Sequence, residues 1–330
     1  MTEIFPIDDL CQASSWIEVP ESIRGGVITI GNFDGVHCGH ATLLGKVREL
    51  AMENGVPAVA VVLDPHPASI LRPEIAPVRL TSIDRRAELM NAHGIDALVV
   101  CKTSADFLKL TALQFFEALV IDRLQATAMV EGPNFFFGRD RGGSTETLKE
   151  LCGNHGMGLS ILKPAEADGQ MISSTRIRGL LEAGKLEEAV AMLGSPHRIR
   201  GRVIQGAQRG RELGFPTANL DKIDVVVPGP GVYGGIARLA SNETSQETNV
   251  HLAAIHIGPN PTFEEDGDRK IEVHLLDYDG DLYDRVLQVD LIARVRDIAR
   301  FESADKLVKQ LDQDIQTIRS RMTSHRDDRD

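Results

Sequence analysis

The sequence lacks the marks of a secreted or membrane-spanning protein. It has four cysteines and no C-x-x-C pair, so neither a disulfide framework nor a zinc site is expected, and a reducing compartment fits. The start MTEIFPIDDL is acidic and lacks the basic and apolar regions of a signal peptide. No apolar run approaches the roughly 18 residues of a membrane span. We therefore expect a cytoplasmic protein that does not bind membranes.

Basic residues are also in the minority. The formal net charge is −12, which argues against a general nucleic-acid-binding protein but permits a local basic pocket for phosphates. The 330 residues, 42% of them hydrophobic and 25% charged, supply apolar material for two cores. We expect a two-domain protein with small-molecule partners, monomeric or weakly homo-oligomeric.

The first part of the chain alternates between strand and helix patterns. Short apolar runs predict buried strands at 27–31, 57–63, 97–101, 127–131 and 158–162. Helical patterns lie at 40–54, from Ser82 to Gly94, from Thr111, from Ser144 and at 175–193. Repeated β-α-β units predict an α/β fold, a doubly wound, Rossmann-like parallel sheet with helices on both faces. The break at Gly194-Ser195-Pro196 predicts that this domain covers 1–193.

The second part has strands without intervening helices. Strand patterns at 200–205, 231–239, 249–257, 270–277 and 286–295 are joined by turns, which predicts an antiparallel barrel or sandwich. Helical spacing from Ala304 to about Met322 predicts a terminal helix. We expect a second domain over 197–322 and a frayed tail over 323–330.

The segment GNFDGVHCGH, residues 31–40, lies where the first predicted strand leads into a helix. Ligands of open α/β sheets bind beyond the carboxyl ends of strands, and a helix N-terminus there favours phosphate. Gly35 and Gly39 permit close backbone approach, and His37 and His40 can donate hydrogen bonds to phosphate oxygens. The pattern alone leaves two alternatives: a metal pair, with His66 of the segment DPHP as a third ligand, or plain surface histidines.

Two further segments favour phosphate at this corner. The run 132–138, GPNFFFG, follows the fourth predicted strand, and at least one of its phenylalanines is expected in the core. The run ISSTRIR, 172–178, opens the last helix of the domain. There Ser174 and Thr175 can bind phosphate or cap the helix, and Arg178 can neutralise phosphate charge.

These motifs together resemble a known family. G-N-F-D-G-V-H-x-G-H, D-P-H-P, N-F-x-F-G and I-S-S-T-R-I-R, in this order, look like the adenylyltransferase half of bacterial bifunctional FAD synthetases, of the H-x-G-H nucleotidyltransferase superfamily. The resemblance implies that the phosphate of FMN attacks the α-phosphorus of ATP, which yields FAD and pyrophosphate. It implies catalytic roles for His37 and His40, flavin binding by His66, and ATP or phosphate binding by Gly31, Asn32, Phe33, Asp34, Gly35, Gly39, Asn134, Ser174, Thr175 and Arg178.

The second domain has its own candidate site. Glycines at 206, 210 and 214 can fold a loop over phosphates, and Thr217 and Asn219 offer oxygen ligands that suit Mg²⁺. Alternation along 271–276 puts Glu272 on the face opposite Ile271. A carboxylate there can remove a proton from a substrate hydroxyl, or can be an ordinary solvated side chain.

This part resembles the riboflavin kinase module of the same family, a six-stranded antiparallel barrel with a flanking helix. The resemblance lies in G-R-x-L-G-F-P-T-A-N, G-V-Y (231–233), P-T-F (261–263) and E-V-H-L-L-D-Y-D-G-D-L-Y (272–283). It implies that the riboflavin 5′-hydroxyl attacks the γ-phosphate of ATP. It implies Glu272 as general base, Thr217 and Asn219 as ligands of Mg-ATP, Gly210, Arg211 and Gly214 on the phosphates, and Phe301 at the flavin. The cofactor is then Mg²⁺, with ATP as co-substrate and FMN and FAD as products.

The chain departs from the family pattern at a few positions. Asn260 stands where relatives often have arginine, Ile298 where an acidic residue is frequent, and Leu63 where phenylalanine is frequent. Cys38 lies between the two histidines, as an ordinary side chain or a redox-sensitive thiol. Two competing functions remain: an enzyme in which one half works or another nucleotide is made, and a flavin-binding regulatory protein without activity.

Overall fold

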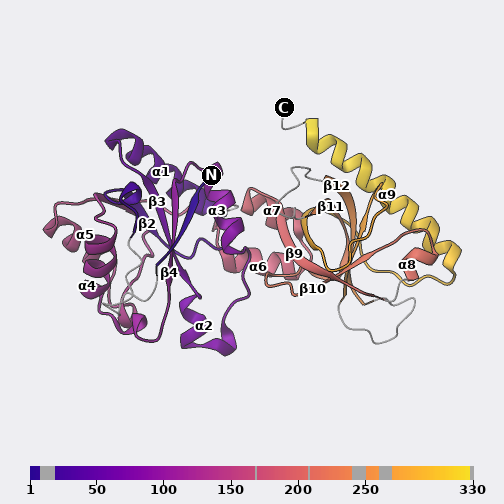
Figure 1. Ribbon diagram of the computed structural model, residues 1–330, viewed down its shortest axis with the longest axis horizontal. Helices are drawn as coiled ribbons and strands as arrows, with labels where there is room; N and C mark the ends of the chain where they lie inside the picture. Colours follow the sequence, from indigo (N-terminus) through magenta and orange to yellow (C-terminus); the bar gives the residue numbers. More distant parts are fainter. Residues whose placement is uncertain (8–18, 168, 207–208, 240–249, 260–269, 328–330) are drawn as a thin grey trace. The chain divides into compact units, whose positions relative to one another are not determined.

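The computed structural model describes residues 1–7, 19–167, 169–206, 209–239, 250–259 and 270–327 (Figure 1). Asn260 and the segment 261–263 lie outside this range. The chain divides into two compact units, Met1–Ser173 and Ser174–Asp330. The helices over 175–193 thus group with the second unit by their contacts, whereas the expected domain boundary at 193 stays a prediction. Each unit is described by itself.

Six strands of the first unit form one sheet in the order β1-β4-β3-β2-β5-β6, and each neighbouring pair runs parallel. Their bounds are β1 (Glu3–Ile7), β2 (Val27–Ile30), β3 (Ala58–Asp64), β4 (Ala97–Lys102), β5 (Ala128–Glu131) and β6 (Gly158–Ile161). This confirms the doubly wound parallel sheet. The edge strand β1 was missed because it is short and contains Pro6, a residue that sheets accept at edges.

Helices cover both faces of this sheet. They are α1 (Cys38–Asn54), α2 (Pro67–Leu71), α3 (Ile83–Ala92), α4 (Ala112–Phe115), the π-helix η4 (Phe116–Arg123) and α5 (Thr145–Asn154). Short helical turns and a hairpin complete the unit: η1 (Glu21–Ile23), η2 (Pro73–Ile75), η3 (Phe107–Lys109), η5 (Arg139–Arg141), β7 (Glu166–Ala167) and β8 (Gln170–Met171).

Successive residues of a strand point to opposite faces of the sheet and belong to two separate hydrophobic cores. In β3, Val59 and Val61 pack with Phe116 of η4 on one side, while Ala60 packs with Leu44 of α1 on the other. Both faces are therefore apolar, which is why the strands read as continuous hydrophobic runs in the sequence.

The direction of strand addition reverses between β2 and β5. Strands β3, β4 and β1 extend the sheet on one side of β2, and β5 and β6 extend it on the other. Open α/β sheets bind ligands at such a switch point, beyond the carboxyl ends of the strands. The β2–α1 corner, residues 31–37, lies at this point.

The second unit begins with two helices and continues into a barrel. Its elements are α6 (Ser174–Glu182), α7 (Leu186–Leu193), β9 (His197–Ile204), α8 (Arg209–Glu212), β10 (Ala218–Asp221), β11 (Gly231–Leu239), β12 (Val250–Gly258), β13 (Lys270–Leu275), β14 (Val286–Arg296) and α9 (Ala304–Asp327). Gly184, with a φ of 72°, separates α6 from α7, so the expected single helix over 175–193 is in fact two. The last helix continues to Asp327, beyond its expected end near Met322.

The six strands close into an antiparallel barrel in the order β10-β13-β12-β11-β14-β9, as expected. In β13, Ile271 and Val273 are buried while Glu272 lies on the partly exposed face. Helix α9 runs along the outside of the barrel and buries Ile318 against Ala293 (Figure 1). Strand β10 was not predicted from the sequence, because it contains no apolar run: its more exposed face carries Asn219 and Asp221.

Candidate active sites

The β2–α1 corner has a constrained backbone. Phe33, Gly35 and Val36 have positive φ angles of 46°, 88° and 42°. Such angles are costly for residues other than glycine. The side chains of Phe33 and Val36 are buried in the core beneath α1, which holds the turn in place. Any contact of Phe33 with phosphate is therefore left to its backbone.

Two stacked imidazoles begin helix α1. His37 caps the helix, and its Nδ1 accepts a hydrogen bond of 3.3 Å from the N–H of His40. The two rings lie 3.6 Å apart between centroids and 13° from parallel. A Cβ at Gly39 would stand 3.1 Å from His37 Nδ1, so glycine leaves room for the ring. Because Nδ1 of His37 accepts, its neutral ring carries the proton on Nε2, which can donate to phosphate.

Both imidazoles are held neutral. Burial lowers the pKa of His37 to about 4, against an opposing effect of its backbone hydrogen bond and of Asp34. The pKa of His40 is lowered well below its ordinary value by burial, by electrostatic coupling to the adjacent His37 and by the charge of Arg86. At neutral pH these rings act as hydrogen-bond donors rather than as cations.

The metal alternative finds no support in the part of the chain that the structure describes. That part contains no group of three His, Cys, Asp or Glu side chains placed to hold a metal ion. His66 caps helix α2, and its Nδ1 accepts a hydrogen bond of 3.0 Å from the N–H of Ala68. A three-histidine site of His37, His40 and His66 is therefore not formed.

Acidification is expected to weaken the first unit through His37. Its pKa of about 4 in the folded protein lies below its ordinary value of 6.5, so below pH 6.5 the unfolded chain binds more protons than the folded one. Stability therefore falls as the pH drops from 6.5 toward 4, by about 2 kcal/mol near pH 5. Urea unfolding, followed by circular dichroism, measures this loss. His37→Asn should lose less stability than the wild type between neutral pH and about pH 5, and equal losses would contradict the prediction.

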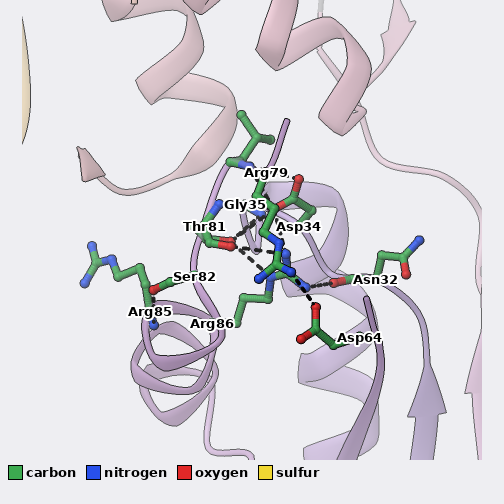
Figure 2. Close-up of polar contacts among 10 residues, drawn as sticks. Asn32, Asp34, Gly35, Asp64, Arg79, Thr81, Ser82, Arg85 and Arg86 are labelled. Carbon is green, nitrogen blue, oxygen red and sulfur yellow. Dashed lines mark hydrogen bonds and ion pairs between the residues drawn. The ribbon is translucent and has the colours of Figure 1, made fainter. Parts of the chain in front are cut away.

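The side chain of Asp34 faces the protein rather than the crevice. Its carboxylate accepts hydrogen bonds from the N–H of Leu80 at 2.9 Å and of Thr81 at 3.1 Å, and from Arg86 at 3.0 Å. Figure 2 shows these groups converging on Asp34. The expected contact of Asp34 with phosphate cannot come from a carboxylate engaged in this way, and a carboxylate would repel phosphate.

Other candidate residues follow neighbouring strands. Asp64 ends β3 and pairs with Arg79 at 2.8 Å, and His66 follows two residues later. Asn134 follows β5 and is exposed. Because these strands flank β2, their carboxyl ends meet at the same edge of the sheet. The structure thus brings His66 and Asn134 to the edge that carries His37 and His40.

Glu131 is a buried acid at the same edge that sequence analysis missed. Its Oε1 accepts a hydrogen bond of 2.8 Å from the N–H of Ile30, which links the ends of β5 and β2. Burial raises the pKa of Glu131 well above its ordinary value. A glutamate at the end of the apolar run 127–131 was the available signal.

Ser174, Thr175 and Arg178 lie on α6, which opens the second unit. The last residues of the first unit pass beside α1, because a Cβ at Gly39 would stand 3.6 Å from the carbonyl oxygen of Ile172. Ser174 follows Ile172 by two residues in the sequence. The roles of these three side chains stay predictions.

The barrel carries a second group of candidates on the partly exposed face of β10 and β13. Glu272 is the cross-strand partner of Asn219, so the two side chains lie on the same face. Glycines of the preceding loop approach both expected metal ligands: a Cβ at Gly206 would overlap the amide of Asn219, and one at Gly210 would stand 3.3 Å from Thr217 Oγ1. Arg211 is exposed, and Gly214 has a φ of 86°.

This arrangement fits Mg²⁺. The hydroxyl of Thr217 and the amide of Asn219 can supply neutral oxygen ligands. The preceding loop lies close to both side chains because Gly206 and Gly210 have no Cβ. Magnesium ions keep several waters and bind through few protein oxygens together with phosphates of the substrate. Thr217 and Asn219 are residues of this kind.

His256 is a neighbour of Glu272 that sequence analysis did not assign. The two residues are cross-strand partners in β12 and β13. Burial lowers the pKa of His256, an effect opposed by Glu272 and assisted by Arg296. Its buried Nδ1 has no hydrogen-bond partner among the described residues. The signal was available, since the predicted strand 249–257 ends in His256-Ile257.

Phe301, the expected flavin residue of the barrel, lies beside Arg296. The guanidinium carbon of Arg296 stands 5.6 Å from the centre of the Phe301 ring. Arg296 also pairs with the buried Asp314 of α9 at 2.8 Å. Ile298 packs against Gly258, where an added Cβ would overlap it. At position 298, where relatives often have an acidic residue, this chain therefore has an isoleucine that makes an apolar contact at the end of β12.

Together these features define a two-module, ATP-using enzyme: a sheet with an H-x-G-H helix start, and a barrel with Thr-x-Asn facing a glutamate. Residues 19–176 match the FAD synthetase family model, and residues 193–322 match the riboflavin kinase model. A protein from Pseudomonas fluorescens is 37% identical over 90% of this chain and 93% of its own, and one from Escherichia coli K12 is 34% identical over 90% and 92%. Both are named bifunctional riboflavin kinase/FMN adenylyltransferase. The chain belongs to the bifunctional riboflavin kinase/FMN adenylyltransferase family.

A solved structure supports the fold over nearly the whole chain. The crystal structure of a macrolide-efflux protein from Streptococcus pneumoniae aligns with a TM-score of 0.80 at 29% identity, over 96% of this chain and 98% of that one. The term macrolide-efflux belongs to the name of the Streptococcus pneumoniae protein. In the present chain, no helix among the described residues is long and apolar enough to cross a membrane.

Proposed function

We propose that FMN is adenylylated at the β2–α1 corner and that riboflavin is phosphorylated at the partly exposed face of β10 and β13, so that one chain converts riboflavin to FAD in two steps. The observation that carries the first assignment is the pair of neutral, stacked imidazoles at the first turn of α1, at the switch point of the sheet. Partners are then the small molecules riboflavin, FMN and ATP, in the cytoplasm.

In the adenylylation step, a phosphate oxygen of FMN forms a bond to the α-phosphorus of ATP. The bond from this phosphorus to the bridging oxygen of the β-phosphate breaks, and pyrophosphate leaves. The imidazoles of His37 and His40 donate hydrogen bonds to phosphate oxygens as charge shifts toward the leaving group. No side chain becomes covalently attached, so catalysis consists of positioning and charge stabilisation.

The other predicted residues of the first site support the same step. The N–H groups at the start of α1 would bind the triphosphate. Gly31 and Asn32 would lie beside it, although the N–H of Gly31 itself donates to the carbonyl oxygen of Val61 at 3.0 Å. His66 and Asn134 take the flavin side of the crevice, beyond β3 and β5. The roles of Ser174, Thr175 and Arg178 rest on the family resemblance alone, which implies that they bind the phosphates of ATP.

In the kinase step, the 5′-oxygen of riboflavin forms a bond to the γ-phosphorus of ATP, the bond to the β-phosphate oxygen breaks, and ADP leaves. The carboxylate of Glu272 accepts the proton of the attacking hydroxyl. Thr217 and Asn219 would hold Mg²⁺, which when bound neutralises negative charge on the phosphates. Gly210, Arg211 and Gly214 lie along the phosphates, and Phe301 lies at the flavin.

Conversion of riboflavin by the purified chain tests the whole proposal. With ATP and Mg²⁺, we expect chromatography to show FMN first and FAD later, and EDTA should stop both steps. FMN without FAD, or FAD only from added FMN, would mean that one half works. Flavin that is bound but not converted would indicate a regulatory protein and would overturn the proposal.

A further inference from the structure

One buried arginine ties the β2–α1 corner to helix α3. The side chain of Arg86 is 5% exposed. Its guanidinium donates to Asp34 Oδ1 at 3.0 Å and to the carbonyl oxygen of Asn32 at 2.9 Å, both in the corner. It also donates to the carbonyl oxygen of Thr81 at 3.1 Å, in the segment before α3. Figure 2 shows Arg86 between these groups.

The segment before α3 also forms hydrogen bonds with the corner that do not involve Arg86. The N–H of Gly35 donates to Thr81 Oγ1 at 2.9 Å, and the N–H of Leu80 donates to the carboxylate of Asp34 at 2.9 Å. Arg86 and Asp34 therefore bridge two stretches that are 52 residues apart in the sequence. The corner is fixed by directional hydrogen bonds in addition to the packing of Phe33.

A buried ion pair is an expensive way to gain stability, because both charges lose water. Here it supports a turn in which Phe33 and Val36 hold positive φ angles that cost free energy. A planar guanidinium with several donors can fix Asn32, Asp34 and Thr81 at once, which a flexible ammonium cannot. This argues that the pair fixes a geometry.

The geometry that it fixes is that of the imidazoles. Residues 31–37 end at the cap residue of α1, His37, and the Nδ1 of His37 accepts a hydrogen bond from the N–H of His40. The charge of Arg86 also acts on His40, since it contributes to the lowered pKa of that ring. Arg86 thus influences both the position and the protonation of the proposed phosphate donors.

We propose that Arg86 is a positioning residue for adenylyl transfer: through Asp34, Asn32 and Thr81 it holds the corner in the conformation that aims His37 and His40 at the phosphates of ATP. This inference deepens the adenylylation proposal and rests on it. Arg86 itself touches no substrate.

Variants at Arg86 test the inference, with FAD formation from FMN measured per folded molecule. Arg86→Met should lower kcat for FAD formation by about one to two orders of magnitude, and Arg86→Lys should lose less because it keeps the charge. Phosphorylation of riboflavin by the same chain should stay near wild type. The matched control is Arg85→Met, since Arg85 lies on the same helix but pairs with Glu88, away from the corner.

A second variant guards against simple unfolding, because Arg86→Met leaves Asp34 buried without its cation. The double variant Asp34→Asn/Arg86→Met removes both charges and should restore the urea midpoint toward that of Arg85→Met, while FAD formation stays low. FAD formation at the Arg85→Met rate, per folded molecule, in both Arg86→Met and the double variant would overturn the inference. If His40→Ala also retained FAD formation, the adenylylation site itself would be wrong; if only the Arg86 variants retained it, this inference alone would fail.

Discussion

Replacement of His40 by alanine will lower FAD formation from FMN by about two to three orders of magnitude, while riboflavin kinase activity is retained. The ring of His40 stacks on the His37 ring and lies against the ring of Phe33, at centroid distances of 3.6 and 5.1 Å. An alanine removes the donor and also the ring against which His37 stacks. Chromatography of FMN, ATP and Mg²⁺ with each variant measures the effect.

The control for His40→Ala is His93→Ala. His93 caps the C-terminal end of α3, and burial lowers its pKa as it does for His40, but it lies outside the corner. We expect His93→Ala to make FAD at nearly the wild-type rate. If His40→Ala abolished both FAD formation and riboflavin phosphorylation, the two modules would not be independent. Unchanged FAD formation in His40→Ala would remove the imidazole from the mechanism.

Replacement of Glu272 by glutamine will lower FMN formation by about two to four orders of magnitude. The amide keeps the size of the carboxylate beside Asn219 and His256 and one acceptor oxygen, but it cannot act as a base toward the riboflavin hydroxyl. FAD formation from added FMN should be unaffected, because the corner lies in the other unit. The measurement is the rate of FMN release from riboflavin.

Glu302→Gln supplies the matched control for Glu272→Gln. Glu302 lies in the same unit, is exposed, and pairs with Lys306 on the surface. Both activities should persist in this variant. FMN formation near the wild-type rate in Glu272→Gln would show that another group accepts the proton, and the neighbouring His256 would be the first to examine.

The parts of the fold that follow from local patterns could be predicted from the sequence. Buried strands β2 to β5 were evident because both faces of the sheet are apolar. The run 158–162 also forms a strand, β6, but its residues are exposed or partly exposed because it lies at the edge of the sheet. The H-x-G-H corner was evident because three glycines and two histidines lie within ten residues. By contrast, Gly184 divides a stretch whose apolar periodicity continues on both sides, and β10 carries polar residues on one face.

The supporting residues of the sites could not be predicted in this way. Arg86 meets Asp34 across 52 residues, and nothing in the pattern around either residue indicates the other. Asp34 belongs to the motif GNFDG, which led to its assignment as a phosphate ligand. Its carboxylate instead accepts hydrogen bonds from N–H groups of the segment before α3. A motif identifies which residues matter at a corner, whereas the direction of each side chain depends on distant parts of the chain.

Glu131 bears on the charge of the sheet edge at which we propose that phosphate binds. The ladder between β2 and β5 pairs Val27 with Ala128 and Ile28 with Met129, and the carboxyl group of Glu131 then spans to the N–H of Ile30. Burial raises the pKa of Glu131 well above its ordinary value, which favours the neutral form of the acid. In that form Glu131 joins the ends of β2 and β5 without adding a negative charge to the edge of the sheet that carries His37 and His40, where we propose that ATP binds.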